Sequence, residues 1–252
     1  MPSKFKFTAL RVLLCTCLSY GISLPTSAQN VPAQVKAAIE RNIRQNARGE
    51  GVRVDAIKAT PVQGIYQVNS SNEIFYMDAT GRYAFVGGAL MDTQTHTDLT
   101  SSQLEKLNAI PWGTLPLQHA VVDVHGNGRR KIAVFEDPLC PICRVFTKFL
   151  DQIEDITIYR FIFPVIDPKS AHIARTVWCS NNRQEAWRLT MAGRQPQGSE
   201  NCDITGLMSI VQFGEQHNIA NTPTVVLSNG KRLVGAIPPE QFMVDLEALN
   251  TQ

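Results

Sequence analysis

The sequence predicts a protein of mixed α+β and α/β class, in which a small antiparallel domain precedes a larger α/β domain. Three observations support this class. A strongly apolar strand pattern at residues 132–135 leads into Cys-Pro-Ile-Cys at residues 140–143, and apolar residues then recur at helical spacing. Alternating runs between residues 52 and 90 are separated by hairpin-turn residues. Two short strand patterns and an amphipathic helix close the chain after residue 223.

The N-terminal part is predicted to be one helix followed by an antiparallel meander. Residues 31–46 place Val35, Ile39 and Ile43 at a spacing of four, which is typical of one helix face. Turn residues then separate four strand patterns, at residues 52–57, 65–69, 73–78 and 83–90. A unit this small buries little of itself, so we expect the strand at 83–90 to pair across the two-fold axis of a homodimer. The alternative is that this unit only packs on the C-terminal domain.

A polar linker helix is predicted at residues 97–108, with capping residues at 100–102 and Pro111 beyond its end. The chain is therefore expected to divide into four parts. They are a signal peptide at residues 1–28, an N-terminal dimerisation domain at 29–96, the linker helix and loop at 97–118, and a C-terminal domain at 119–252.

The C-terminal domain is predicted to alternate strands and helices. Strand patterns occur at residues 120–124, 131–135, 156–163, 224–227 and 232–234. Helical patterns follow the Cys-Pro-Ile-Cys motif and recur at residues 170–180, 183–192, 205–213 and 239–249. A β-α-β opening followed by a β-hairpin and a terminal helix, with further helices inserted between them, describes a thioredoxin fold.

The Cys-Pro-Ile-Cys motif is predicted to carry the chemistry. Cys140 stands at the start of a helix, and Pro141 occupies an early helical position where a missing N–H costs nothing. Unpaired N–H groups and the helix dipole stabilise a thiolate at such a position. Cys143 lies about one turn further on. We therefore predict that Cys140 is the attacking nucleophile and Cys143 the resolving thiol of a dithiol/disulfide exchanger.

Two other interpretations of this motif are disfavoured. A zinc site needs a second Cys/His pair at short spacing, but Cys179 and Cys202 are isolated from each other and no histidines form such a pair. A purely structural disulfide between Cys140 and Cys143 would close too small a loop to stabilise much. We expect neither a metal nor a cofactor. Glu136 and Asp137 lie close to the motif, but the sequence assigns them no role.

The N-terminus has the pattern of a secretory signal peptide. Lys4, Lys6 and Arg11 form a positive region, and the apolar stretch at residues 12–24 is too short to span a bilayer. Small residues end this stretch, and we predict cleavage after Ala28 and export to the periplasm without stable membrane insertion. A lipoprotein alternative, with Cys17 acylated, is disfavoured because Leu14-Cys15-Thr16 is a poor lipobox.

Cleavage would change both the charge and the cysteine count. The net charge falls from +2 to −1, because the removed residues include three basic and no acidic side chains. A net charge this close to zero gives no reason to expect nucleic-acid binding. Four of six cysteines remain, an even number that suits an oxidising compartment. Of the three pairings that four cysteines allow, we favour Cys140–Cys143 as the active pair and Cys179–Cys202 as a structural disulfide.

Thr222-Pro223 is a second feature of the predicted site. Pro223 comes just before a predicted strand, the one place in a strand where proline is tolerated. In thioredoxin folds a cis-proline at this place abuts the Cys-x-x-Cys motif, and the residue before it presents backbone groups to a substrate. We therefore predict that Thr222 and Pro223 bind substrate, although a cis bond cannot be read from sequence.

Taken together, these motifs resemble the DsbC and DsbG family of periplasmic thiol:disulfide interchange proteins. The likeness covers nearly all of the mature chain. It is carried by Val134-Phe135 before Cys140-Pro141-Ile142-Cys143, by Trp178-Cys179, Met191-Ala192-Gly193 and Cys202-Asp203, and by residues 222–230 and Ile237-Pro238-Pro239.

The resemblance implies a thioredoxin-like catalytic domain with inserted helices, preceded by a small cystatin-like antiparallel dimerisation domain and a linker helix. It also implies a V-shaped homodimer that isomerises wrongly paired disulfides of exported proteins, holds unfolded chains as a chaperone does, and is kept reduced by a membrane thiol reductase of the DsbD type. By the same likeness Cys179–Cys202 is the structural disulfide.

One departure from the family leaves alternatives open. The dipeptide between the cysteines is Pro141-Ile142, whereas the family's usual pairs carry Tyr in the second place. That dipeptide tunes the reduction potential and the docking surface. A dedicated disulfide oxidant, or a holdase chaperone whose thiols are secondary, therefore stay as alternatives to an isomerase.

Overall fold

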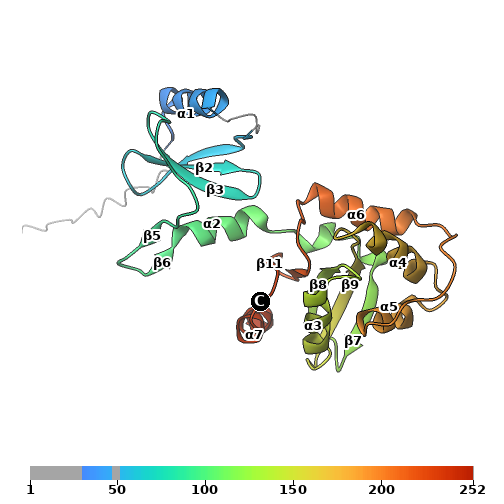
Figure 1. Cartoon of the computed structure of the whole chain (residues 1–252). Helices are drawn as coiled ribbons and strands as arrows, with labels where there is room; N and C mark the ends of the chain where they lie inside the picture. The colour runs from blue at the N-terminus through green and yellow to red at the C-terminus, as the bar shows by residue number, and fades with distance from the viewer. Residues whose placement is uncertain (1–29, 47–51, 252) are drawn as a thin grey trace, which may run out of the picture.

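The computed structural model describes residues 30–46 and 52–251, which form two lobes joined by a helix (Figure 1). The predicted signal peptide, with its cleavage site after Ala28, lies outside the described residues. The smaller lobe contains α1 and strands β1–β4, and the larger lobe contains strands β7–β11 with helices on both faces. Within the described ranges, no helix is both long enough and apolar enough to cross a membrane.

The smaller lobe is a helix packed on a four-stranded antiparallel sheet. Helix α1 (Ala33–Asn46) is followed by strands in the order β1-β2-β3-β4, with bounds Ala56–Ala59, Ile65–Ser70, Glu73–Asp78 and Ala84–Phe85. Ile39 and Ile43, two of the residues predicted to share a helix face, pack against Val68 and Met77 of the sheet. The predicted helix and the strands at 65–69 and 73–78 are confirmed.

Two strand predictions in this lobe are wrong. The first strand begins at Ala56 rather than at residue 52, and the pattern at 83–90 yields only the two-residue strand β4. Gly87 takes a positive φ of 73°, and Gly88 follows it, so the strand does not continue beyond Phe85. The apolar residues of this stretch stay exposed instead of lining a long edge: Tyr83 61%, Phe85 61% and Val86 78%.

A short hairpin that the sequence did not predict precedes the linker helix. It consists of β5 (Met91–Asp92) and β6 (Thr97–Asp98). Helix α2 (Leu99–Asn108) then starts at Asp98, whose side chain accepts a hydrogen bond from Ser101 N at 2.9 Å. The predicted caps at 100–102 are therefore wrong. Thr100 is buried, and its hydroxyl bonds to Tyr76 Oη and Leu90 N instead, which ties α2 to the smaller lobe.

The linker joins the larger lobe through specific contacts. After α2, two short 3₁₀ helices, η1 (Trp112–Thr114) and η2 (Leu117–His119), lead into β7. Ile110 N donates to Gly230 O at 3.0 Å, and Lys231 Nζ lies 3.2 Å from Glu105 Oε1 of α2. Ile110 and Leu115 are buried within the core of the larger lobe. The loop that we assigned to the linker therefore contributes to the packing of the C-terminal domain.

The larger lobe is built on a five-stranded mixed sheet of order β11-β10-β8-β9-β7. Its strands are β7 (Val121–His125), β8 (Arg130–Glu136), β9 (Ile156–Ile162), β10 (Thr224–Leu227) and β11 (Arg232–Val234). Only β8 and β9 are parallel, and α3 (Pro141–Leu150) connects them. The predicted β-α-β unit is thus confirmed. The turn at 126–128 connects β7 to β8, but β9 lies between these two strands.

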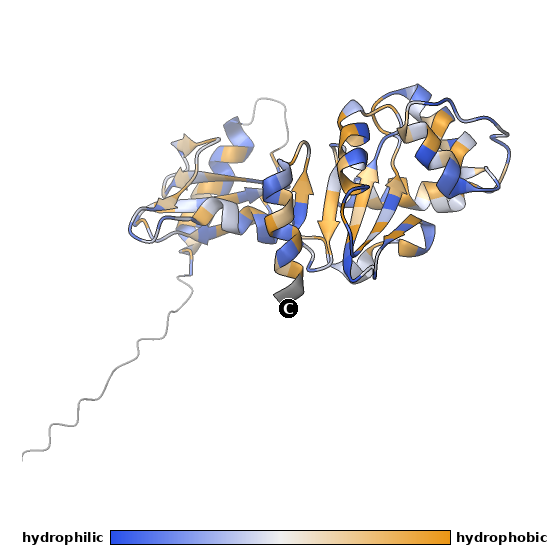
Figure 2. Ribbon diagram, turned by 90° about the horizontal axis from the view of Figure 1, so that it is seen from below, coloured by the Kyte–Doolittle hydropathy of each residue, from blue (hydrophilic) through white to orange (hydrophobic). Residues whose placement is uncertain are grey.

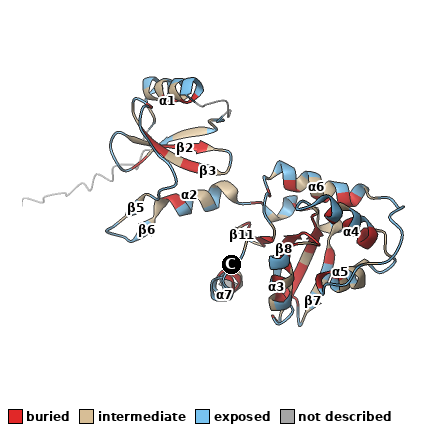
Figure 3. Ribbon diagram, viewed as in Figure 1, coloured by how far each residue is buried: buried red, intermediate tan, exposed pale blue. Residues whose placement is uncertain are grey.

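Helices cover both faces of this sheet and bury its central strands (Figure 3). Helices α3 and α7 (Pro239–Glu247) pack on one face, where Phe146 and Phe242 meet Ile132 and Val134 of β8. Three helices cover the other face: α4 (Pro168–Trp178), α5 (Arg183–Met191) and α6 (Thr205–Gln216). Figure 2 shows the apolar strands enclosed between these amphipathic helices. All five helices agree with the predicted ranges to within a few residues.

Candidate active site

Cys140 is the N-cap of α3, directly after the loop that leaves the central strand β8. Its sulfur accepts a hydrogen bond from Cys143 N at 3.1 Å, as an N-cap side chain does, and Pro141 follows at the first helical position. The helix dipole and the free N–H groups of the first turn therefore point at this sulfur. The local sequence alone is enough to produce this arrangement.

Thr222 and Pro223 lie against the same sulfur. Strand β10 pairs with β8 so that Thr224 is opposite Phe135, which brings the segment before β10 to the end of β8 where the cysteines begin. The Cys140 thiol lies 3.4 Å from the carbonyl oxygen of Thr222, to which it donates. The Thr222–Pro223 peptide bond is cis. The structure thus brings both predicted substrate-binding residues to the dithiol.

Both thiols of the motif are enclosed by the protein. Both cysteines are free, but Cys140 is only 3% exposed and Cys143 is fully buried. The Cys140 sulfur is covered by the loop that contains Thr222. The protein surface around the Cys140–Cys143 dithiol is apolar. Four side chains of α3 and of the loop after β9 are largely exposed: Ile142, Val145, Val165 and Ile166.

Asp137 holds the loops around the dithiol together, a role that sequence reasoning missed. Its carboxylate is fully buried and accepts hydrogen bonds from Leu139 N at 2.7 Å and from Ser170 Oγ at 2.8 Å. It also accepts from the backbone N–H groups of Val165 and Ile166, at 2.7 and 2.9 Å. The Asp-Pro dipeptide at the end of a strand was the available signal, since Asp often bonds to a backbone N–H two residues on.

Glu136 and Arg160 form a buried ion pair beneath the dithiol, which the sequence also did not reveal. Glu136 is fully buried and Arg160 is 2% exposed, with Nη1 3.2 Å from Glu136 Oε2. Thr147 of α3 donates to Glu136 Oε1 at 3.0 Å. On its other side, Arg160 reaches Asp123 Oδ2 at 2.6 Å and Asp151 Oδ1 at 3.2 Å. Burial raises the pKa of Glu136, and the charge of Arg160 opposes that rise.

Cys143 is held as a neutral thiol by its surroundings. Burial is the main cause that raises its pKa, and the negative charge of Glu136 raises it further. The backbone amide of Asp137 acts in the opposite direction but does not outweigh them. The two thiols therefore have different surroundings: Cys140 lies at the start of a helix, whereas Cys143 is buried close to a carboxylate.

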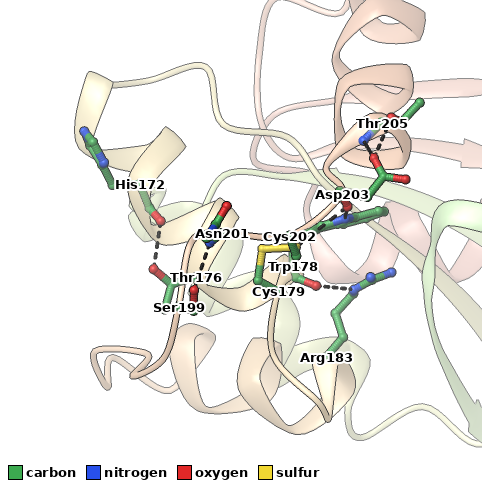
Figure 4. Close-up of a disulfide and its surroundings, with 10 residues drawn as sticks. All are labelled: His172, Thr176, Trp178, Cys179, Arg183, Ser199, Asn201, Cys202, Asp203 and Thr205. Carbon is green, nitrogen blue, oxygen red and sulfur yellow. Dashed lines mark hydrogen bonds between the residues drawn. A yellow bond between two sulfur atoms is a disulfide. The ribbon is translucent and has the colours of Figure 1, made fainter.

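The other two cysteines form a disulfide that ties the end of α4 to the segment before α6 (Figure 4). Next to it, Trp178 Nε1 donates to Asp203 O at 3.0 Å, and the Arg183 guanidinium stacks 3.6 Å from the Trp178 ring. Within the described residues, no group of three or more His, Cys, Asp or Glu side chains is arranged to hold a metal ion. Cys179 and Cys202 are bonded to each other, which agrees with the predicted structural pair.

Two thiols one helical turn apart at the end of a central strand can pass between dithiol and disulfide, and the sheet around them has the order of a thioredoxin fold. This architecture defines a thioredoxin-like thiol–disulfide oxidoreductase. Residues 117–250 match the family described as thioredoxin-like domain, and residues 26–101 match the disulfide bond isomerase protein N-terminal domain. The chain belongs to the DsbC family of thiol:disulfide interchange proteins.

Two relatives and one solved structure are similar to this chain. The probable thiol:disulfide interchange protein DsbC of Bordetella parapertussis is 33% identical over 216 residues, covering 86% of this chain and 75% of the relative. The DsbC of Escherichia coli K12 is 26% identical over 210 residues, covering 79% and 84%. A crystal structure of a disulfide interchange protein from Neisseria gonorrhoeae is 35% identical, covers 53% of this chain and 94% of its own, and has a TM-score of 0.47.

Proposed function

We propose that this protein isomerises or reduces wrongly paired disulfides in exported proteins, with Cys140 as the attacking thiol and Cys143 as the resolving thiol. The observation that carries the proposal is the position of the Cys140 sulfur. It accepts from Cys143 N at the start of α3 and lies 3.4 Å from Thr222 O. The first contact favours a thiolate, and the second marks the place where a substrate chain would meet it.

In the proposed mechanism, the Cys140 thiolate attacks one sulfur of a substrate disulfide. A mixed disulfide forms, and the other substrate sulfur leaves as a thiolate. If that thiolate attacks a different disulfide of the substrate and finally displaces Cys140, the substrate is isomerised. If Cys143 attacks Cys140 instead, the substrate is released reduced, and the Cys140–Cys143 disulfide has to be reduced by a partner. A membrane thiol reductase of the DsbD type fits this need.

Substrate binding is proposed to use the Thr222-Pro223 backbone and the apolar surface beside it. Ile142, Val145, Val165 and Ile166 are 44–68% exposed, and a surface of this kind suits the apolar segments that misfolded chains expose. Ile142 stands where the family usually has Tyr. It offers a substrate an aliphatic surface without a hydroxyl group.

The remaining parts of the proposal concern assembly and location. We infer that the protein acts in the periplasm after cleavage at Ala28, and that it forms a homodimer through residues 29–96. Exposed Tyr83, Phe85 and Val86 beside the edge strand β4 support a self-complementary contact there. Two catalytic lobes on such a dimer could enclose a misfolded chain, which is the basis for proposing chaperone activity.

A refolding assay with a scrambled multi-disulfide protein tests the proposal. Cys140→Ala should abolish both reduction and isomerisation, while Cys143→Ala should trap mixed disulfides through Cys140. Suppression of aggregation by Cys140→Ala would show that chaperone activity is separable from redox chemistry. Activity that survives in Cys140→Ala would refute the assignment. Recovery of Cys140 and Cys143 mainly in the oxidised form from cells would favour a disulfide oxidant over an isomerase.

A further inference from the structure

The turn of the β10–β11 hairpin meets the linker at two points. Ile110 N donates to Gly230 O at 3.0 Å, and Lys231 Nζ lies 3.2 Å from Glu105 Oε1 of α2. Gly230 has a φ of +88°, and a Cβ built on it would lie 3.2 Å from Ile110 O, so the two backbones approach closely. Figure 1 shows the end of α2 beside β11. The hairpin turn therefore lies directly on the segment that joins the lobes.

Lys231 is bound from two sides at once. Its ammonium group also lies 2.8 Å from Oδ1 of Asp245 in α7, a residue that is only 8% exposed. Burial acts to lower the pKa of Lys231, but its hydrogen bonds to Asp245 and Glu105 outweigh burial and raise that pKa. The lysine therefore stays charged, and it joins a helix of the larger lobe to the helix that comes from the smaller lobe.

A second contact joins the lobes at the end of α6. Asn72, in the turn between β2 and β3, donates through Nδ2 to Asn218 O at 3.4 Å. The guanidinium of Arg232, which follows Lys231 in the hairpin, donates to the same carbonyl at 2.8 Å and to His217 O at 2.9 Å. The lobes are thus held at two places, and neighbouring residues of one hairpin take part in both.

Helix α2 is fixed to the smaller lobe at its start and reaches the larger lobe at its end. Thr100 is buried and bonds to Tyr76 Oη and Leu90 N, which holds the first turn of α2. Ile110 is buried in the core of the larger lobe. Between them, the backbone changes from helical to extended at Ala109. Rotations that change the angle between the lobes are therefore concentrated at the end of α2.

The same hairpin leads to the proposed substrate site. At its open end, Gly235 N donates to Pro223 O at 2.8 Å. Thr222, directly before Pro223, lies against Cys140. Strand β10 pairs with β8 along its length, so the hairpin is part of the sheet that carries the dithiol. A contact at the hairpin turn therefore fixes the direction in which the dithiol faces relative to the smaller lobe.

We propose that Lys231 is a positioning residue, which binds α2 through Glu105 and so sets the angle at which the dithiol faces a protein substrate held between the lobes. The inference rests on the proposed function, because it concerns the isomerisation of misfolded chains. A protein substrate spans both lobes, whereas a small disulfide needs only the dithiol. The Glu105–Lys231 pair thus acts on the first class of substrate and not on the second.

The size of the expected effect follows from the exposure of this pair. The Glu105 side chain is 56% exposed and that of Lys231 is 28% exposed. An ion pair of this kind shifts an equilibrium by about two- to fivefold, so Glu105→Gln should increase the population of displaced lobes by about that factor. Glu105→Lys replaces attraction by repulsion and should increase it about tenfold.

The lobe angle is measured on the full mature chain. Spin labels are attached through unnatural side chains at Lys58 of the smaller lobe and Lys148 of the larger lobe, which are both exposed. Labelled chains are mixed with an excess of unlabelled chain, so that each distance lies within one chain. Pulsed dipolar spectroscopy should show displaced distances that increase from wild type to Glu105→Gln to Glu105→Lys. In about 1 M NaCl, where the Debye length is about 3 Å, these differences should shrink.

Activity is measured on two substrates in parallel. Isomerisation of a scrambled multi-disulfide protein should slow about two- to fivefold in Glu105→Gln and about tenfold in Glu105→Lys. Reduction of oxidised glutathione should change by less than about twofold, because the helix start at Cys140 is untouched. A loss of general stability would lower both activities together, so the ratio of the two rates reports the positioning role.

Asp245→Asn is the matched control, because it removes the other carboxylate of the same lysine with the same change of charge. Asp245 belongs to the larger lobe, so this variant should be less stable but should keep the wild-type lobe distances and ratio of activities. Unchanged lobe distances or unchanged protein isomerisation in Glu105→Lys would overturn the inference, as would an equal displacement in Asp245→Asn. A wild-type protein that isomerises no substrate would instead refute the proposed function.

Discussion

The sulfur of Cys140 lies 3.4 Å from the carbonyl oxygen of Thr222, although 82 residues separate them in the chain. The contact arises because β8 and β10 are neighbours in the sheet, so that the segment after one strand meets the segment before the other. It leaves Cys140 only 3% exposed. This contact supports the proposal that a substrate disulfide meets Cys140 beside the Thr222-Pro223 backbone.

The first prediction concerns the different reactivity of the two thiols. Alkylation of the reduced protein with iodoacetamide at about pH 6 should label Cys140 and leave Cys143 unmodified, because only Cys140 has a helix start to stabilise its thiolate. Burial and Glu136 raise the pKa of Cys143, so its thiolate is scarcer at any given pH and its labelling should need strongly alkaline conditions or unfolding. Mass spectrometry of the labelled peptides measures both. Equal labelling at pH 6 would contradict the assigned roles.

The second prediction concerns the Cys179–Cys202 disulfide, whose cysteines are 23 positions apart. Closing a loop of this length is worth roughly 3 kcal/mol in the chain-entropy model, so Cys179→Ser/Cys202→Ser should lower the free energy of unfolding by about that amount. Chemical denaturation measures the change. The disulfide should also survive mild reduction that opens an oxidised Cys140–Cys143 pair. Both bonds opening in one titration step, with no loss of stability in the double variant, would show that the pair is not structural.

The third prediction uses a glycine at which a methyl group has no room. Gly214 lies in α6, and a Cβ built there would be 2.3 Å from Cε2 of the fully buried Phe163 ring. Gly→Ala in a helix usually stabilises a protein by about 1 kcal/mol. Here the clash with the Phe163 ring should outweigh that gain. Gly214→Ala should therefore lower the free energy of unfolding by about 1–3 kcal/mol.

Gly88→Ala is the matched control for this prediction. No atom lies within 4 Å of a Cβ built at Gly88, so the substitution should change the free energy of unfolding by less than about 0.5 kcal/mol. Urea denaturation of the wild type, Gly214→Ala and Gly88→Ala measures both changes in the free energy of unfolding. A Gly214→Ala variant as stable as the wild type would mean that α6 packs less tightly on Phe163 than the structure shows.

The fourth prediction concerns the dependence of isomerase activity on the smaller lobe. A fragment of residues 109–252 should be folded and monomeric and should still reduce small disulfides, but it should lose most isomerase activity, because it lacks the proposed dimer contact. A fragment starting at residue 119 should be less stable, since it loses Ile110 and Leu115 from the core. Sedimentation of the mature protein as a monomer, or full isomerase activity in the 109–252 fragment, would contradict the homodimer.

Much of the fold could be predicted because its signals are local. The spacing of Ile39 and Ile43 predicts the buried face of α1, and the Cys-Pro step predicts the start of α3. The stretch at 83–90 shows the limit of such reasoning. Its side chains alternate as in a strand, which predicts a strand up to residue 90. Gly87 and Gly88 nevertheless follow soon after Phe85, and glycine weakens a strand, so the observed strand ends at Phe85.

The sequence by itself was enough to predict the thioredoxin fold and to place the dithiol at a helix start, because that helix start is built from residues adjacent to Cys140. Only the tertiary structure decided what surrounds that dithiol. Glu136 is four residues before Cys140, yet its partner Arg160 comes from β9. Burial and ion pairing depend on which elements pack together, and that information is distributed over the whole chain rather than in any one segment.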